Sequence, residues 1–591
     1  MTLAFASPAA AEWVRVDTPH FVVFGQAGEK STRVIAVEFE RFREAITRVM
    51  PVASGASPVP TLVVVFADRR SFSPFAPRFN GRPVQLDGYF QGTETDNTIA
   101  LSLEQRESAL RIVFHEYTHL VIAGATRALP AWLGEGLAEY YSTFQVRGDG
   151  RGAITGRAIP SHLQLLNTRT LLPLDELLSV ERDSPLYNEG ERRSVFYAQS
   201  WALTHMLMSG EPGRSEQLAQ YVRLTAGGTP ARDAWRQVFG TFDAIGLLKA
   251  YVRRDTMRGF SFRFDEQIKA ASAVTSVASP SEVEAVLGML LRNIDPGEAE
   301  ARIRKAAGLA PPSPLARAML GFLRADIGGD DAHQLLVPAA ADRGDWLAQY
   351  YTAAGLAHLV AGSTRPDVPS IDAARSALGV VMRARPDLAH AHALTAYVAD
   401  PEDAIASVAR ARALAPGRPD YAYLEARLHS NAGEFAAARG LLAPLLTAAY
   451  SEEVRNRART LMTEVAAEEA RVKPGGDVRV GGLTPGHTYF AYRTLRSGEN
   501  RLEGTLDRIE CARSGSVTLH VRDASTMRRF SADGLAEIEW LTYGDDRRDP
   551  VRCGARTPAD LVYVTWRPLT PATKGVTGQV VALEFLPDRD R

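Results

Sequence analysis

The chain has 591 residues, of which 45% are hydrophobic and 23% are charged, and its formal net charge is -1. This length exceeds what one hydrophobic core supports, so about three or four domains are expected. The near-neutral charge gives no reason to expect a nucleic acid or an anionic membrane as a partner. No apolar run approaches the roughly 20 residues of a transmembrane helix.

The first residues indicate export. Residues 3–11 read Leu-Ala-Phe-Ala-Ser-Pro-Ala-Ala-Ala, which resembles the end of a secretory signal with its small-residue cleavage site, and a plain alanine-rich terminus is the alternative. We therefore expect a periplasmic or secreted protein. In such a protein Cys511 and Cys553 can form a disulfide, and two buried free thiols are the equal alternative.

The next hundred residues predict an α/β arrangement. Alternating apolar residues over 13–24 predict a strand pair, and helical spacing over 31–50 predicts a helix that Pro51 ends. The β-branched run 61–66 is typical of a central strand that is covered on both faces.

Two further segments lead up to the motif that carries chemistry. Residues 68–96 are rich in Arg, Pro, Gly and aromatic residues and predict a surface loop. Residues 97–102 predict a short edge strand, and such an edge can pair with an extended peptide.

Residues 115–119 read His-Glu-Tyr-Thr-His within a stretch, 107–124, whose apolar residues recur at helical spacing. On a helix, His115 and His119 lie one turn apart on the same face, so two imidazoles can bind one metal ion. Glu116 lies beside that face, where it can polarise a metal-bound water without binding the metal. This segment predicts one half of a metal site.

The following predicted helix, which starts near Pro130, supplies the other half. Residues 132–139 read Trp-Leu-Gly-Glu-Gly-Leu-Ala-Glu. Glu135 would be the third ligand and would leave the fourth position of a tetrahedral Zn²⁺ open, as in catalytic sites. Two carboxylates one turn apart are costly to bury, so we expect Zn²⁺ to meet Glu135 and the free ring N–H of a ligating histidine to meet Glu139. A closed structural zinc site fits less well, because no cysteine is near.

These two segments resemble the gluzincin zinc metallopeptidases, the group that includes thermolysin and aminopeptidase N, and bacterial peptidase-like domains of that clan which carry helical repeats. The resemblance covers roughly residues 12–270 and implies a zincin-like α+β fold and zinc-dependent peptide hydrolysis. It implies three zinc ligands, namely His115, His119 and Glu135. It also implies that Glu116 is the base and that Glu139 is the partner of His115.

The sequence departs from the aminopeptidases in two places. Gly134 stands where they have Asn, which leaves the ligand frame intact. Before the metal helix there is no Gly-x-Met-Glu-Asn segment, which reads the free amine of their substrates. Residues 95–100 occupy that place and suit backbone pairing better, so we expect an endopeptidase.

Hydrolysis by a Glu-activated, zinc-bound water creates an oxyanion that needs a second donor besides the metal. The helical stretch 194–205 offers polar groups, and Tyr197 is our candidate for this donor. An ordinary core tyrosine is the alternative reading, and Tyr187 and His205 are rival donors.

From about residue 276 to 470 the chain is rich in Ala, Leu and Arg, and a repeat is visible. Arg-Pro-Asp at 385–387 recurs at 418–420, a separation of 33 residues. Alanines recur at the same spacing: Ala393 with Ala426, and Ala404 with Ala437. This pattern resembles tetratricopeptide (TPR) repeats and predicts an α-helical surface that can bind a protein partner, with a plain helical linker as the alternative.

Residues 471–591 predict a small all-β barrel or sandwich of accessory role. Alternating runs over 504–511, 516–521, 538–543, 561–566 and 580–585 predict strands.

The sequence thus predicts a multidomain protein: a peptidase domain (12–275), TPR-like repeats (276–470) and a β domain (471–591). We expect a zinc endopeptidase that acts on a peptide or protein substrate. The alternative is an inactive peptidase-like scaffold whose repeats bind protein partners; the intact ligands and Glu116 favour the enzyme.

Overall fold

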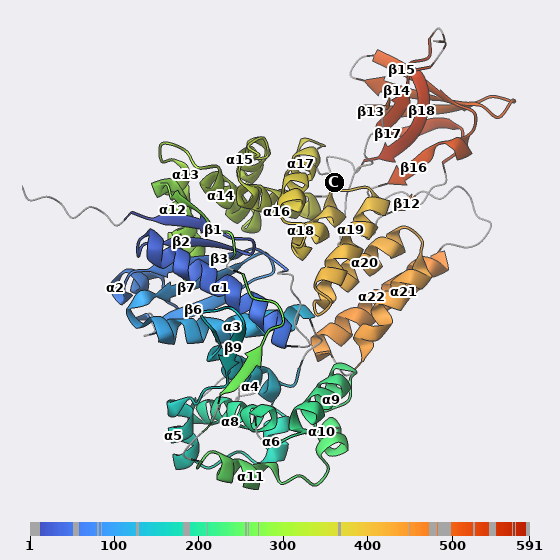
Figure 1. Cartoon of the computed structure of the whole chain (residues 1–591). Coiled ribbons are helices and arrows are strands. Elements are labelled where there is room, and N and C mark those ends of the chain that lie inside the picture. The colour runs from blue at the N-terminus through green and yellow to red at the C-terminus, as the bar shows by residue number, and fades with distance from the viewer. Residues whose placement is uncertain are drawn as a thin grey trace, which may run out of the picture.

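A computed structural model describes residues 12–50, 58–79, 82–83, 86–125, 129–180, 190–209, 211–254, 257, 259–269, 271–363, 368–447, 450–471, 481–482, 498–523, 526–542, 551–569, 571, 573 and 575–586. The chain is multidomain. An α/β part leads into an arc of paired helices and then into a β-rich domain, coloured blue to green, green to orange, and red in Figure 1. The alanine-rich segment 3–11 lies outside the described residues.

The first part is built on a six-stranded sheet of order β11-β1-β2-β3-β7-β6. Its strands are β1 (Val14–Asp17), β2 (Phe21–Gly25), β3 (Thr61–Phe66), β6 (Gly88–Gly92), β7 (Asn97–Ser102) and β11 (Val274–Val277). β2, β3 and β7 are parallel, whereas β1, β6 and β11 pair antiparallel with their neighbours. The strands predicted at 13–24, 61–66 and 97–102 are confirmed. The predicted boundary after residue 275 falls inside β11.

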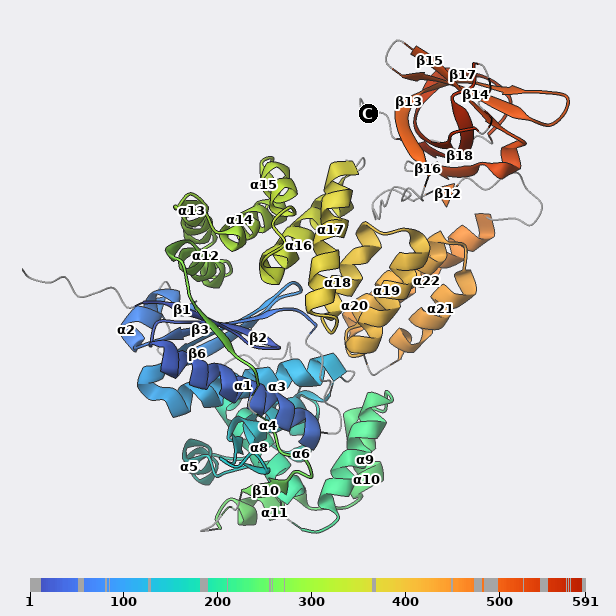
Figure 2. The ribbon, with the colours of Figure 1, turned by 45° about the horizontal axis from the view of Figure 1, so that its top comes forward.

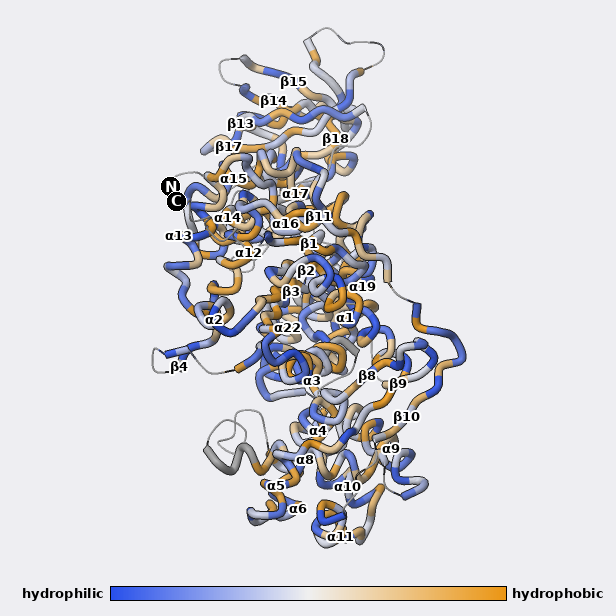
Figure 3. The backbone as a smooth tube through the Cα atoms, turned by 60° about the vertical axis from the view of Figure 1, so that its left-hand side comes forward, coloured by the Kyte–Doolittle hydropathy of each residue, from blue (hydrophilic) through white to orange (hydrophobic). Residues whose placement is uncertain are grey.

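Both faces of this sheet are buried, which explains the unbroken apolar run of β3. Phe21, Val23 and Val63 share a core with α1 (Glu29–Val49) and α3 (Arg106–Ala125) on one face. Phe24 and Val64 face the other way and share a core with the first repeat helices, α12 (Pro280–Leu291), α14 (Pro314–Asp326) and α16 (Trp346–Gly362). In Figure 3, where the tube is coloured by hydropathy, orange hydrophobic and blue hydrophilic stretches both occur on the helices of this part. The α/β part and the first repeat helices therefore form one packed unit.

Two predictions about residues 68–102 are wrong. Residues 68–96 are not a surface loop, because they contain α2 (Arg69–Phe72), the short pair β4 (Arg78–Phe79) and β5 (Arg82–Pro83), and β6. Aromatic residues of this stretch enter the core, and the Tyr89 hydroxyl donates to the Phe75 carbonyl at 2.7 Å. β7 is not an edge strand either, because β6 pairs with its outer side. On this side the edge of the sheet is β6, and β11 forms the opposite edge.

Below the sheet, α3 is followed by a mainly helical subdomain. It comprises α4 (Ala131–Ser142), α5 (Pro160–Thr168), α6 (Leu174–Leu178), α8 (Gly190–Ser209), α9 (Arg214–Ala226), α10 (Ala231–Phe239) and α11 (Ala244–Tyr251). A small sheet of β8 (Gln145–Val146), β9 (Gly152–Thr155) and β10 (Phe260–Arg263) accompanies these helices.

The repeat part forms the curved row of helices seen in Figure 2. Besides α12, α14 and α16 it contains α13 (Pro296–Ala307), α15 (Ala332–Ala339), α17 (Val368–Ala384), α18 (Ala389–Leu394), α19 (Pro401–Leu414), α20 (Pro419–Asn431), α21 (Phe435–Leu442) and α22 (Glu452–Arg471). The predicted equivalence of Ala404 with Ala437 is wrong by one residue, because Ala437 is exposed, whereas Ala404 and Ala438 are buried. Ala393 and Ala426, on the first helices of two successive pairs, are 33 residues apart. Ala404 and Ala438, on the second helices, are one residue further apart.

The C-terminal domain is a seven-stranded sheet that closes on itself through the pairing of β17 with β18. Its strands are β12 (Gly481–Gly482), β13 (Asn500–Cys511), β14 (Val517–Asp523), β15 (Thr526–Ala532), β16 (Glu539–Thr542), β17 (Gly554–Arg567) and β18 (Gly578–Phe585). The five predicted strands are confirmed, and β12 and β15 were missed. Cys511 and Cys553 form a disulfide that encloses a 42-residue separation. None of the described helices combines the length and apolar character that crossing a membrane requires.

Candidate metal centre

Packing of α3 and α4 sets the geometry of the centre. The apolar side of α3, with Val113 and Tyr117, is buried in the core beneath the sheet, which leaves the histidine side of the helix to face α4. On α4, Glu135 is only 2% exposed. The two predicted halves of the motif therefore meet at one place.

Three donor atoms form a nearly equilateral triangle. The Nε2 atoms of His115 and His119 are 3.2 Å apart, and each lies 3.3 Å from Oε2 of Glu135. Ligands at about 2.0–2.1 Å from a tetrahedral Zn²⁺ are about 3.3–3.4 Å from one another. Two imidazoles and one carboxylate at this spacing fit a zinc ion and leave its fourth position open. Among the described residues, this is the one cluster of three such groups with metal-binding spacing.

The buried charges of the centre stabilise one another. Burial raises the pKa of Glu135, but hydrogen bonds from His115 and His119 outweigh this and hold the pKa well below its usual range. Burial lowers the pKa of His115, but the neighbouring carboxylates, Glu135 first, outweigh this and raise it. The centre thus contains a buried carboxylate, that of Glu135, which needs cationic partners, and a bound metal ion would be such a partner.

Glu139 joins the centre to a residue that the sequence did not reveal. Its Oε1 lies 3.5 Å from Nδ1 of His115, the ring nitrogen that faces away from Glu135, and its Oε2 lies 3.4 Å from Nε2 of His162 on α5. Burial raises the pKa of Glu139, but His162 and the charge of His115 outweigh it and lower the pKa. No motif spacing links residue 162 to the rest, because its place depends on how α5 packs.

The other predicted catalytic residues separate into those near the centre and those remote from it. Glu116 follows His115 in the sequence of α3, is half-buried, and its charge acts on the ring of His115. Tyr197 on α8 is half-buried, and its ring lies 6.4 Å from that of His115 at an angle of 26°. His205 is fully buried and bonds to the Tyr251 hydroxyl and to a backbone carbonyl, so it belongs to the core and not to the centre. Tyr187 lies outside the described residues.

The frame around Glu135 is fixed by close packing on its far side. The indole N–H of Trp132 donates to the Tyr221 hydroxyl on α9 at 3.1 Å. A Cβ atom on Gly136 would lie 2.1 Å from Oγ1 of Thr204 and 2.5 Å from the Ser200 carbonyl oxygen of α8. A Cβ atom on Gly134 would meet nothing within 4 Å. Gly136 therefore lets α4 approach α8 closely, whereas Gly134 has no such role.

The loop that joins β6 to β7 is held by the repeat helices. Asp96 is fully buried and binds Nη2 of Arg292 and the Tyr351 hydroxyl, both at 2.8 Å. The Tyr350 hydroxyl contacts the Thr95 carbonyl and Nδ1 of His390. Residues 95–96 thus tie the sheet to the repeats, and 97–102 are interior strand, so the predicted backbone pairing with a substrate at 95–100 is not available there.

Comparisons with known proteins give little further guidance. No protein-family model matches the chain, and no curated protein matches it. Among solved structures, the chain is similar to a thermophilic TPR protein of Thermus thermophilus, with 20% identity and a TM-score of 0.25, over 31% of this chain and 99% of that one. A similarity with this TM-score carries no argument about the fold, and the repeats are recognised from their paired helices alone.

Proposed function

We propose that this protein is a zinc-dependent peptide hydrolase, and the observation that carries the proposal is the triangle of His115, His119 and Glu135. Two imidazoles and one carboxylate are the ligands of catalytic zinc in peptidases of the gluzincin kind. When bound, Zn²⁺ would supply Lewis acidity that polarises the scissile carbonyl and makes an attacking water more acidic.

The chain's own residues would perform the remaining tasks. Glu116 takes a proton from the attacking water and returns it to the leaving amine. The Tyr197 hydroxyl donates a hydrogen bond to the carbonyl oxygen as its negative charge develops. Glu139 accepts from Nδ1 of His115 and so directs Nε2 of this ring to the ligand position.

An extended substrate would bind along β6, which is the edge of the sheet and contacts α3. Backbone pairing with an edge strand does not require a chain terminus. The aminopeptidase segment that reads a free amine is absent from the sequence. These two features favour an endopeptidase.

Export is part of the proposal. The Cys511–Cys553 disulfide suits an oxidising compartment, because cytosolic thiols are kept reduced. Together with the signal-like sequence at 3–11, it supports a periplasmic or secreted protein.

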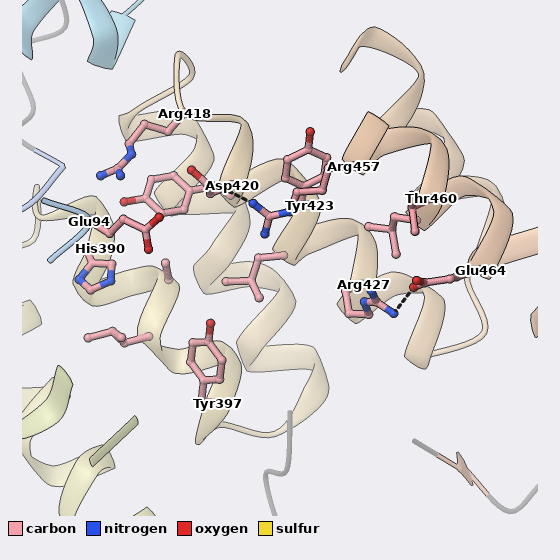
Figure 4. Close-up of a pocket in the computed structure, with 15 residues that line it drawn as sticks. Glu94, His390, Tyr397, Arg418, Asp420, Tyr423, Arg427, Arg457, Thr460 and Glu464 are labelled. Carbon is pink, nitrogen blue, oxygen red and sulfur yellow. Dashed lines mark hydrogen bonds and ion pairs between the residues drawn. The ribbon is translucent and has the colours of Figure 1, made fainter. Parts of the chain in front are cut away.

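A protein partner on the repeats is a second candidate function, and the inner side of α18, α20 and α22 supports it. A cavity of about 350 Å³ lies there (Figure 4). Its polar lining includes Arg427, paired with Glu464 at 2.7 Å, and Arg457, paired with Asp420 at 2.9 Å. Tyrosines line it as well, and aromatic residues and arginines are the residue types enriched in protein interfaces.

The test combines metal analysis with a cleavage assay on a broad library of internally quenched peptides blocked at both ends. We expect about one zinc per chain in the wild type and in Glu116→Gln, with cleavage only in the wild type, lost on chelation and restored by Zn²⁺. Absence of zinc would refute the proposal. Zinc without cleavage would favour the scaffold whose repeats bind a partner.

A further inference from the structure

A second cavity lies on the opposite side of α3 from β6. It measures about 980 Å³ and is bounded by α1, the first half of α3, the end of α4, β8 and residues 157–160. None of the three candidate zinc ligands lines it, and neither does β6. It is therefore separate from β6, along which a peptide substrate would pair.

The lining of this cavity carries an excess of positive charge. It contains four arginines, namely Arg41, Arg106, Arg111 and Arg157, and two acidic residues. Glu38 pairs through Oε1 with Arg106 at 2.5 Å, while its Oε2 is buried without a hydrogen-bond partner among the described residues, and Glu107 lies 3.5 Å from Arg157. The other two arginines of the lining, Arg41 and Arg111, take part in neither of these pairs.

Arg41 and Arg111 make no hydrogen bond and no ion pair within the part of the chain that the structure describes, although the positive charge of Arg111 is among those that lower the pKa of Glu139. Nε of Arg41 is moreover buried and lacks an acceptor there. A buried charged donor without an acceptor costs free energy, and a bound anion would offset that cost.

A helix N-terminus adds to the positive potential of the cavity. α3 does not supply it, because a 3-10 helix, Leu103–Gln105, runs directly into α3 at Arg106. α5 begins at Pro160, and Ile159 before it provides no side-chain cap. The amide groups at a helix N-terminus carry partial positive charge and attract anions.

The floor of the cavity is apolar and aromatic. Phe42 and Phe114 stack at 3.9 Å between ring centroids, and Phe144 lies 5.4 Å from Phe42. All three are buried and line the cavity. The site thus combines cationic donors with a surface for a flat apolar body.

We propose that this cavity binds a small molecule that joins a phosphate or carboxylate group to an apolar body, with the anionic group held by Arg41 and Arg111. A guanidinium group can donate two parallel hydrogen bonds to the oxygens of either a phosphate or a carboxylate, so the site would recognise the oxyanion that both groups share. Arg111 lies one helical turn before His115, which places the bound anion next to the candidate metal centre but outside it.

The test is calorimetric titration of the full chain with phenyl phosphate and, separately, with benzoate, which distinguish the two anions; phenol is the uncharged control. We expect one of the anionic probes or both to bind with about one molecule per chain, more weakly as salt is raised, and phenol not to bind. Arg41→Met and Arg111→Met should each weaken binding about tenfold or more, because each removes a charged hydrogen-bond partner. Arg41→Lys, which keeps the charge, should weaken it less.

Arg223→Met is the matched control, because Arg223 is exposed on α9 and makes no ion pair among the described residues. Melting curves like that of the wild type would show that the variants fold. Binding of neither anion to the wild type would overturn the proposal. Equal affinity in Arg41→Met, Arg111→Met and Arg223→Met would overturn it as well.

Discussion

Replacing Gly136 by Ala tests the packing that fixes the position of Glu135. The new Cβ would lie 2.5 Å from the Ser200 carbonyl oxygen and 2.1 Å from Oγ1 of Thr204. A threonine side chain can rotate, but a backbone oxygen inside α8 cannot, so α4 must shift away. Such overpacking costs about 1–3 kcal/mol. Alanine also gains about 1 kcal/mol over glycine inside a helix, which offsets part of this cost.

Gly134→Ala is the matched control, since it makes the same chemical change on the same helix and its Cβ meets nothing within 4 Å. The gain in helix propensity is common to both variants, so their difference isolates the clash, about 1–3 kcal/mol. For a unit of this size that difference corresponds to about 2–12 °C in melting temperature, with Gly136→Ala the lower. Gly136→Ala should also bind zinc more weakly, because Glu135 moves with α4. Equal melting temperatures would refute the packing argument.

Four other changes test separate parts of the account. Glu139→Ala should weaken zinc binding about 10–100-fold in a competition titration, because it removes the carboxylate that lies 3.5 Å from Nδ1 of His115; unchanged affinity would argue against that role. Tyr197→Phe should lower kcat about 100–1000-fold at unchanged zinc content, and an unchanged kcat would assign the oxyanion donor elsewhere. Burial lowers the pKa of His390 to about 3, so below its usual value of about 6.5 the unfolded chain binds a proton that the folded chain excludes. Stability from this group is complete above about pH 6.5 and declines as the pH falls toward 3, and His390→Gln should flatten this part of the profile in denaturant titrations. Replacing Cys511 and Cys553 by Ser should lower the unfolding free energy of the β domain by about 2–4 kcal/mol, and an unchanged unfolding midpoint would contradict this.

Local patterns predicted those parts of the fold whose cause is local. The β-branched run of β3 indicates burial on both faces, and the structure places it in the middle of the sheet. What covers the second face could not be predicted, because α12, α14 and α16 lie more than two hundred residues further along the chain. No periodicity within one segment records which distant helix packs on it.

The errors near the sheet edge have the same physical origin. Residues 88–92 belong to the stretch that was predicted as a surface loop, and their strand form depends on pairing with β7. Asp96 is the last residue of the stretch that was predicted as a surface loop, yet it is buried, and Arg292 supplies its counter-charge from the repeat part. Both outcomes depend on tertiary partners and not on local propensity.

The candidate metal centre was predictable to the extent that helix geometry determines it. The spacing of His115 and His119 requires one helical face, and the structure brings both to Glu135. His162 could not be found in this way, because its approach to Glu139 depends on the packing of α5. The roles of Glu116 and Tyr197 remain predictions, since a position near the ligands is necessary for them but not sufficient.

X-ray absorption at the zinc edge, on the protein loaded with one equivalent of Zn²⁺, tests the central claim most directly. We predict four nitrogen or oxygen neighbours at about 2.0–2.1 Å, with the outer-shell scattering of two imidazole rings, and loss of one ring signal in His119→Ala. A zinc ion surrounded by six water-like oxygens, or a spectrum that is unchanged in His119→Ala, would contradict the assignment of His115, His119 and Glu135 as a zinc site.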